Sequence, residues 1–242
     1  MVLYTVSRDN EKTGPCVSAW IGGSKEESHA SCDASGCPMR PWAREPGAPI
    51  CYAQGGQSAG AAAGMRRAAA LKPAAYSLAA AIARAPRSVR MLRMSAIGDP
   101  GVIGASEASS IRQQAVAAGL RIVGYLHAWR KAEHWKGWLM ASCRDLEEAD
   151  EAIDAGWRAT VAMKTIPTDS AGRLVRSGLT PKGRRWTACP AMLRPVADYG
   201  PRRGVDCTLC MICDASRPGP VVAFFDHGPG GAWRYRSRQE DK

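Results

Sequence analysis

Residues 89–101 read VRMLRMSAIGDPG. Residues 89–97 look like a β-strand, and the Gly-Asp-Pro-Gly that follows is a turn signal that stops it. Helical sequence then runs over 106–118, where Ser106 is a suitable N-cap and Gly119 a suitable residue just beyond the helix end. Strand, turn and helix in this order form the first half of a βαβ unit.

The same alternation continues toward the C-terminus. Further strands are predicted over 120–126, 138–142 and 157–163, and an acidic helix over 145–155 precedes the last of them. Strands that alternate with helices of about ten residues indicate a parallel sheet. The expected fold class is therefore α/β, as a partial or complete (β/α) barrel.

Two segments outside this central part lack a regular period. Residues 7–60 are rich in Gly, Ser, Pro and Cys and are expected to form one long loop, a kind of segment that is usually functional. Ala-rich helical sequence follows over 58–84, and Pro73 should break it. Residues 166–219 are polar, basic and rich in Gly and Pro, and a last strand is predicted over 221–225.

These patterns divide the chain into two expected parts. Residues 1–165 would form the barrel portion with its N-terminal cysteine loop. Residues 166–242 would form a basic, cysteine-rich metal-binding module that ends with the last strand.

The net charge of +11 is unevenly distributed along the 242 residues. The first hundred residues carry twelve Lys and Arg against seven Asp and Glu, residues 101–165 balance, and 166–242 carry thirteen against seven. Phosphate-bearing partners are the usual reason for such an excess. The sequence has neither a long apolar run nor the features of a signal peptide, so we expect a cytoplasmic protein without a membrane span.

The first cysteine group lies within the long loop. Cys32, Cys37 and Cys51 form the pattern Cys-x4-Cys-Pro-x12-Cys-Tyr. In a reducing compartment, clustered cysteines indicate metal ligands or reactive thiols and not disulfides. Three thiolates can hold three irons of a [4Fe–4S] cluster and leave the fourth iron open. Zinc, with His29 or Cys16 as a fourth ligand, is the alternative.

The order of these features resembles the radical S-adenosylmethionine (SAM) enzymes. The shared features are three cysteines on a loop, a following helix, and a strand that ends in a Gly-acid-Pro turn. The contexts Cys37-Pro38 and Cys51-Tyr52-Ala53-Gln54 also resemble small phage-encoded relatives of that superfamily. The resemblance covers about residues 15–165.

The resemblance implies a barrel with the cluster at its open mouth and SAM bound to the open iron. Gly98, Asp99 and Pro100 would take the place of the family's Gly-Gly-Glu-Pro turn, which binds the SAM amino group. Such an enzyme generates a radical that abstracts hydrogen from its substrate. The chain departs from the family's Cys-x3-Cys-x2-Cys, because the gaps here are four and thirteen residues. If phage-encoded, the protein would act in the host cytoplasm.

The second cysteine group has the sharper motif. Cys207, Cys210 and Cys213 form Cys-x2-Cys-x2-Cys, with Cys189 as the natural fourth ligand and His227 as its rival. This spacing suits a [4Fe–4S] cluster as well as zinc. With either metal, binding would supply folding energy to a polar segment that has little core of its own.

Arginines and one aromatic residue lie near this second group. Arginine pairs with phosphate oxygens, and an aromatic ring can stack on a base. We expect nucleic acid, or a nucleic-acid-processing complex, as the partner, with a solvated basic face as the alternative. The candidate contact residues are Arg184, Arg185, Trp186, Arg202 and Arg203.

Four residues fall at predicted strand ends, where parallel α/β sheets gather their ligands. His127 would be a general acid or base, or else a hydrogen-bonded structural histidine. Cys143 would donate a hydrogen atom, or else be a buried inert thiol. Asp99 is a further catalytic candidate, and Lys164 would meet a carboxylate or phosphate, or else lie on the surface.

Two further functional hypotheses stay open. One is a non-enzymatic iron–sulfur or zinc protein that binds nucleic acid or a transcription complex, which the altered cysteine spacing favours. The other is a zinc-containing enzyme that resembles the transglycosylases and exchanges bases, with Asp99 as nucleophile. The second hypothesis would not need the cysteines of the N-terminal loop.

Overall fold

The computed structural model describes most of the chain, including all of the central region. The described residues are 1–8, 13–22, 30–32, 34, 56–163, 167–171, 173, 175–190 and 205–225. The helices are α3 (Gly56–Leu71), α4 (Leu78–Arg84), α5 (Ala105–Ala117), α6 (Leu146–Asp154) and α7 (Cys207–Cys210). The short 3-10 helices are η2 (Pro73–Tyr76), η3 (Pro100–Val102) and η4 (Glu133–Trp135). In this part of the chain, no helix has the length and apolar character needed to cross a bilayer.

The strands confirm the α/β class. They are β1 (Val2–Ser7), β2 (Cys16–Ile21), β3 (Met91–Ile97), β4 (Arg121–Val123), β5 (Tyr125–Leu126), β6 (Met140–Cys143), β7 (Ala159–Met163), β8 (Ser177–Leu179), β9 (Arg185–Ala188) and β10 (Val221–Phe225). Two strand pairs are antiparallel, β1 with β2 and β8 with β9. The other pairs, β2 with β3, β3 with β4, β5 with β6, β6 with β7, β7 with β10 and β10 with β9, are parallel. One sheet has the order β1-β2-β3-β4, and the other has β5-β6-β7-β10-β9-β8.

Gly124 joins the two sheets. It stands between β4, which pairs with β3, and β5, which pairs with β6. A Cβ atom at position 124 would lie 2.8 Å from both the Cβ and the carbonyl oxygen of Met94. Only glycine lets the chain pass so close to β3, so this residue allows one segment to serve two sheets.

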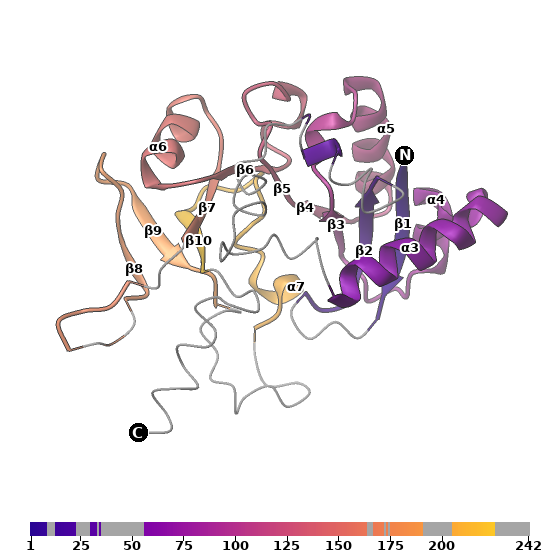
Figure 1. Ribbon diagram of the computed structural model, residues 1–242, viewed down its shortest axis with the longest axis horizontal. Coiled ribbons are helices and arrows are strands. Elements are labelled where there is room, and N and C mark those ends of the chain that lie inside the picture. Colours follow the sequence, from indigo (N-terminus) through magenta and orange to yellow (C-terminus); the bar gives the residue numbers. More distant parts are fainter. Residues whose placement is uncertain are drawn as a thin grey trace.

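Helices cover one face of the strands, which we call the outer face. In Figure 1, α5 and α6 lie on one side of the strands and α7 lies on the other. Buried side chains of α4, α5 and α6 pack with Leu92, Met94 and Val161 in the main hydrophobic core. A second apolar cluster, on the inner face, joins Met91, Val123 and other strand residues to the cysteine-containing C-terminal segment.

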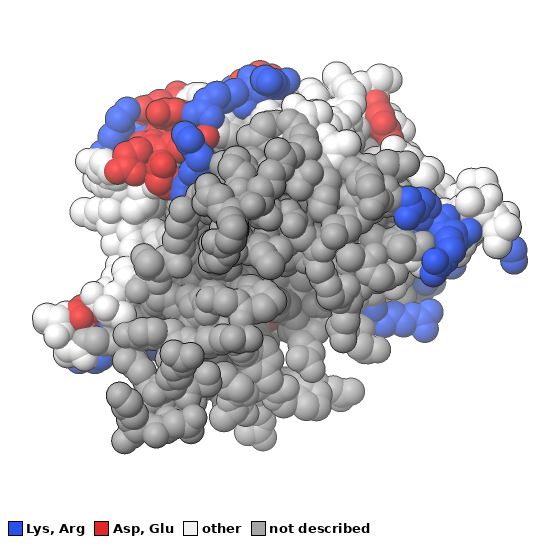
Figure 2. All heavy atoms as spheres, viewed as in Figure 1, with Lys and Arg blue, Asp and Glu red and all other residues white. Residues whose placement is uncertain are grey.

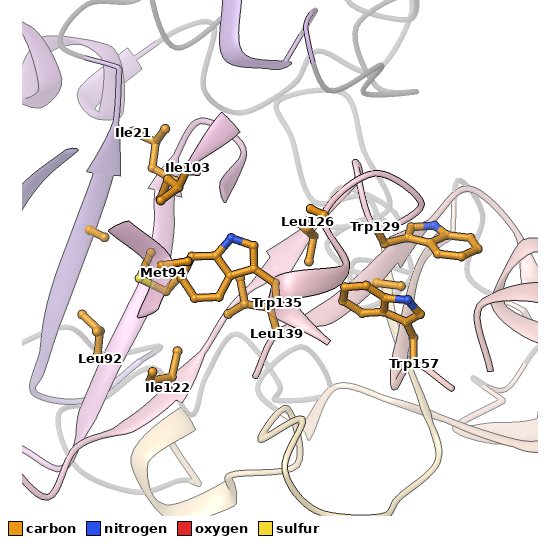
Figure 3. Packing of buried hydrophobic residues seen from close by; sticks show 14 of the residues in the cluster. Ile21, Leu92, Met94, Ile103, Ile122, Leu126, Trp129, Trp135, Leu139 and Trp157 are labelled. Carbon is orange, nitrogen blue, oxygen red and sulfur yellow. The ribbon is translucent and has the colours of Figure 1, made fainter. Parts of the chain in front are cut away.

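Tryptophans fill the centre of the outer core. Trp135 is fully buried, and Figure 3 shows its ring between Met94 and Leu139. Its indole Nε1 donates a hydrogen bond to the carbonyl oxygen of Pro100, 3.1 Å away, which satisfies the buried polar atom. Trp129 and Trp157 meet edge to face with 6.3 Å between ring centres (Figure 3). This core anchors the turn that follows β3.

Helix boundaries follow local signals with one exception. Asp145 caps α6, because its side chain accepts from the Glu148 amide at 2.7 Å. The predicted N-cap of α5 was wrong: the helix starts at Ala105, and Gly104 precedes it without a side-chain cap. Gly119 does follow α5 with a φ of +67°. The predicted break at Pro73 is confirmed, since α3 ends at Leu71.

Two predicted irregular segments contain strands. Residues 16–21 of the predicted loop form β2, which is buried almost throughout because it pairs on both sides, with β1 and β3. β8 and β9 lie within 166–219, where no strand was expected. Strand β10, encoded last, lies between β7 and β9. The C-terminal segment therefore completes the second sheet.

Candidate functional site

Three polar side chains form a connected row at the carboxyl ends of β3, β5 and β6. Asp99 follows β3, His127 follows β5, and Ser142 lies at the end of β6. Asp99 and His127 were expected at this edge, but Ser142 was not. Lys164 lies outside the described residues.

Asp99 occupies the centre of this polar group, with only 2% of its surface exposed. Its Oδ1 accepts a hydrogen bond from the Gly101 amide at 2.7 Å, which shapes the turn. Its Oδ2 accepts from the His127 amide at 2.7 Å and lies 3.3 Å from His127 Nδ1. Asp99 therefore ties the end of β3 to the end of β5 and orients the imidazole ring.

His127 links Asp99 to Ser142 on β6. Its Nε2 lies 3.1 Å from Ser142 Oγ, so a proton can be shared between the ring and the hydroxyl. About a quarter of the imidazole surface is exposed, whereas the Asp99 carboxylate beneath it is covered. A partly exposed imidazole held by a buried carboxylate is an arrangement that can accept and return a proton.

The neighbouring Cys143 faces the other way. Successive residues of a strand point to opposite faces, so Ser142 and Cys143 lie on different sides of β6. Cys143 is 1% exposed and belongs to the outer core. Burial, followed by the nearby Glu148 carboxylate, raises the pKa of this thiol well above its usual value. The structure thus gives Cys143 the surroundings of a buried inert thiol.

The Gly98–Asp99 turn packs tightly against the end of β2. Gly98 has a φ of +83°, and a Cβ atom there would lie 2.3 Å from the carbonyl oxygen of Ile21. The Asp99 amide also donates to Ser31 Oγ at 3.1 Å. Ser31 is buried and directly precedes Cys32 in the chain. The start of the N-terminal cysteine loop is therefore held against this turn.

Only one member of the first cysteine group can be located. Cys32 is half-buried and follows Ser31 in a helical stretch, residues 30–32. Cys37 and Cys51 lie outside the described residues. The ligand set predicted for this loop stays a prediction.

The second cysteine group gathers against the inner face. Cys189 directly follows β9, and its amide donates to the Ala223 carbonyl in β10 at 2.9 Å. Cys213 belongs to the inner cluster with Cys189 and Met140, and Cys207 packs against that cluster. Residues separated by about twenty positions in sequence thus meet over the same strands.

The thiols of this group affect one another's ionisation. Burial raises the pKa of Cys213 to about 12; Cys189 and Cys207 raise it too, whereas a hydrogen bond with the Tyr125 hydroxyl opposes the rise. Burial and the neighbouring Cys189 raise the pKa of Cys207 to about 11, although Arg93 lowers it. These groups are near enough to repel one another as thiolates, and a metal cation would relieve that repulsion.

The backbone of the Cys-x2-Cys-x2-Cys segment has local caps. Asp206 accepts from the Leu209 amide at 3.0 Å and begins the short α7. Met211 adopts a left-handed conformation with a φ of +49°, which reverses the chain before Cys213. Gly14, before β2, lies so close to Asp206 that a Cβ atom would approach its Oδ2 to 2.7 Å.

Two arginines fasten the same segment to the sheet. Arg158, just before β7, donates to the carbonyl oxygens of Ile212 at 3.1 Å, Pro220 at 3.2 Å and Asp214 at 3.3 Å, and also to that of Arg217. Arg121, at the start of β4, pairs with the buried Asp214 carboxylate at 2.6 Å. A forked guanidinium suits several carbonyls at once, which an ammonium group does not.

Within the ranges that the structure describes, no three His, Cys, Asp or Glu side chains are arranged so that they could hold a metal ion. The four C-terminal cysteines share one neighbourhood, but their sulfur atoms do not surround a common centre.

The predicted nucleic-acid residues divide into three kinds. Arg184 pairs with Asp150 at 3.0 Å and also with Asp154, so its guanidinium ties β9 to α6. Trp186 is 6% exposed within the outer core and does not present its ring for base stacking. Arg185 is exposed, and Arg202 and Arg203 lie outside the described residues.

Comparison of the chain with protein-family models, with curated proteins and with solved structures gave no match.

Functional information therefore comes from the inner face itself. Ser142 lies two residues beyond Met140 on β6, and His127 lies two beyond Tyr125. Because side chains two apart share a face, the polar edge and the cysteine group lie along the same side of the sheet.

Proposed function

We propose that this chain is a metal–thiolate protein of radical SAM-like architecture that acts on or binds nucleic acid. The observation that carries the proposal is the contact between the Asp99 amide and Ser31 Oγ. It brings the start of the Cys32, Cys37 and Cys51 loop to the turn at the carboxyl edge of the strands. A cofactor held by both the loop and the turn requires this proximity.

The sheet topology supports a partial barrel. The strands from β2 to β7 lie side by side in the order of the sequence, and each strand pair among them is parallel. Because β4 and β5 are two halves of one segment, these strands fill five positions. Helices α5 and α6 cross on the outer face, as in a (β/α) barrel. Within the described residues, the strand pairs end at β1 and β8 without joining them.

The donor set of the loop suits an iron–sulfur cluster. Cys32, Cys37 and Cys51 would hold three irons of a [4Fe–4S] cluster and leave one iron for a chelating ligand. When bound with SAM, such a cluster supplies an electron and a carbon-centred radical. The role of this chain's own residues is then to position the substrate and to move protons.

His127 is the residue we assign to proton movement. Asp99 Oδ2 holds its Nδ1 side, which leaves Nε2 directed toward Ser142 and the open edge. A substrate hydroxyl or amine that reached this edge would exchange a proton with Nε2. Ser142 would relay that proton through its own hydroxyl group.

The second cysteine group fits a structural metal centre. Cys189, Cys207, Cys210 and Cys213 offer four sulfur donors, the set that both tetrahedral zinc and a [4Fe–4S] cluster use. The donors are already close to one another, because Cys189 raises the pKa values of both Cys207 and Cys213. The centre would fasten the segment between β9 and β10 to the inner face.

A non-enzymatic binding protein is the second candidate. Both carboxylate oxygens of Asp99 already accept hydrogen bonds from the protein's own backbone. An Asp that contacted the SAM amino group, or attacked a base as a nucleophile, would need an oxygen that the ligand can reach, whereas Asp99 is only 2% exposed. This burial favours a cluster or zinc protein without SAM chemistry, and disfavours the transglycosylase-like hypothesis.

Metal analysis of anaerobically purified protein tests the proposal. We expect iron, sulfide and an electron paramagnetic resonance signal after reduction, with Cys32→Ser removing the N-terminal cluster and Cys213→Ser removing the C-terminal metal. Cys143→Ala is the matched control, because this thiol faces the outer core and should leave both metal contents unchanged. Wild-type protein that folds without iron or zinc would refute the metal–thiolate proposal.

Addition of SAM to the reduced protein separates the two candidates. A changed signal and formation of 5′-deoxyadenosine are expected from the enzyme. In that case His127→Gln should retain 5′-deoxyadenosine formation but slow the turnover of substrate, because the imidazole acts after the radical forms. An iron-loaded protein that binds nucleic acid but never cleaves SAM would establish the binding protein.

A further inference from the structure

A hollow of about 370 Å³ opens beside the end of β1. It lies where the end of β1 meets the last turns of α3, the short η2 and the end of α4. Such a volume lies within the usual range for small-ligand sites. Its wall is formed by Thr5, Val6, Arg8, Ala68, Lys72, Ala75, Tyr76 and Arg84.

Three cationic side chains surround this hollow. Arg8, Lys72 and Arg84 come from three different elements or their ends, and all three are exposed at its rim. Within the described part of the chain, none of them forms an ion pair with Asp or Glu. By contrast, Lys182 and Arg184 on the β8–β9 side are paired with α6. The cations around the hollow are therefore available to a ligand.

The surrounding sequence reinforces the positive charge. Residues 56–90, from the start of α3 to β3, contain six Lys and Arg and no Asp or Glu. Figure 2 shows Lys and Arg atoms on the right-hand side of the molecule, where Figure 1 places α3 and α4. The larger group of acidic side chains lies over α6 at the opposite end of the view, and a smaller one lies at the upper right, by α5. The hollow thus lies in a positive local field that concentrates anions.

Two uncharged side chains complete the site. Thr5 Oγ1 accepts a hydrogen bond from Trp20 Nε1 at 2.9 Å, so its own hydroxyl proton is left to donate. Tyr76 is half-buried and is one of the residues that line the hollow. A tetrahedral oxyanion can take donors from several directions at once, and an aromatic ring beside it can stack on a base.

We infer that this hollow binds the phosphate group of a nucleotide, either free or within a nucleic-acid strand. The inference deepens the proposed function, since it places nucleic-acid contact on the α3–α4 side and away from Arg184 and Trp186. Arg8, Lys72 and Arg84 take the phosphate oxygens, Thr5 donates a hydrogen bond, and Tyr76 supports the adjoining base. Helix α3 connects this site to the end of the N-terminal cysteine loop.

Fluorescence anisotropy with a labelled 20-nucleotide single strand tests the inference on the full-length protein. Lys72→Ala and Arg84→Ala should each weaken binding about three- to tenfold, and each should reduce the slope of log affinity against log salt concentration by about 0.7. Lys131→Ala is the matched control, because Lys131 is also an exposed lysine without an ion pair in the described part of the chain but lies far along the sequence from the hollow. It should change affinity by less than about twofold.

Competition separates the two sources of the phosphate. Adenosine 5′-monophosphate that displaces the strand, while adenosine does not, would assign the hollow to free nucleotides. A strand that binds through Lys72 and Arg84 but resists the mononucleotide would assign it to nucleic acid. Strand binding that is unchanged in both variants would overturn the inference and leave the proposed partner intact. Wild-type protein that binds none of these probes would refute both the phosphate site and the proposed nucleic-acid partner, whatever its metal content.

Discussion

The two faces of the sheet are stabilised in different ways. The outer face is covered by α4, α5 and α6 and buries large apolar side chains such as Trp135 and Leu139. The inner face carries the smaller apolar cluster. It is covered by a segment that Arg121 and Arg158 fasten through polar contacts. Apolar burial alone can hold the first arrangement, whereas the second depends on directed bonds and, in our proposal, on metal.

The largest loss of stability is expected on the outer face. Trp135→Ala would remove a fully buried indole and leave a cavity, at a cost of about 3–5 kcal/mol in the free energy of unfolding. Urea denaturation followed by circular dichroism measures this loss. The same loss is expected with and without a metal chelator, because the outer core has no thiolate ligands in its centre. A loss that chelation abolished would contradict the separation of the two faces.

A smaller loss is expected when the inner segment is released. Arg158→Ala removes donors to four carbonyl oxygens, which should cost about 2–3 kcal/mol. Hydrogen exchange should accelerate in residues 207–220 and stay unchanged in α5. Arg158→Lys keeps the charge but loses the fork, and should fall between wild type and the alanine variant. Uniform acceleration across both regions would argue that the segment and the outer core unfold together.

On the outer side, the Asp150 carboxylate joins α6 to the β8–β9 hairpin through polar contacts. Burial opposes ionisation of its carboxyl, but hydrogen bonds from Thr180 at 2.7 Å and the Lys182 amide at 2.9 Å, with the Arg184 ion pair, lower its pKa below the usual value. A lowered folded-state pKa adds stability above the unfolded pKa of about 4, and this is lost as pH falls through the folded value.

We therefore expect Asp150→Asn to cost about 2 kcal/mol at pH 7 and progressively less below pH 4. Thermal denaturation across pH 2.5–7, with wild type as reference, measures the difference. Asp169→Asn serves as the comparison, since among the described residues the Asp169 carboxylate bonds only to Ala171 and Arg173 of its own exposed turn. An equal difference at every pH would show that the carboxylate charge does not stabilise the β8–β9 hairpin.

The smallest effect on stability is expected at the polar edge of the inner face. Ser142→Ala removes one hydroxyl that contacts His127 and should change the free energy of unfolding by less than about 1 kcal/mol. Because His127 Nε2 then loses its hydroxyl partner, the ¹⁵N chemical shifts of the imidazole ring should change, which nuclear magnetic resonance detects. Thr187→Ala removes a partly exposed hydroxyl on β9 and is the control for a general loss of stability. Unchanged ring shifts would remove Ser142 from the proposed proton relay.

Local sequence patterns predicted most of the central region. Short apolar runs bounded by turn residues gave strands within a few residues of β3, β6, β7 and β10, because each pattern is a property of neighbouring residues. Strand β2 was missed because Cys, Ser and Gly around it resemble loop composition. It is stable as a strand because it pairs on both sides, and sequence alone does not reveal such partners.

The candidate site was predicted only in part. The strand-end rule identified Asp99 and His127, and the structure joins them. At the end of β6 it selected Cys143, while the neighbouring Ser142 is the residue that meets His127. The prediction chose the wrong face of the strand, because adjacent residues of a strand point their side chains to opposite faces of the sheet.

By itself, the sequence determined the α/β class, the parallel run of strands and the two groups of cysteines. Periodicity, turn residues and short spacings carry that information locally. Only the tertiary structure decided that β10 lies between β7 and β9, that Gly98 presses against Ile21, and that Trp186 is buried in the core. Each of these depends on which distant segments become neighbours, and that choice is made by packing of the whole chain.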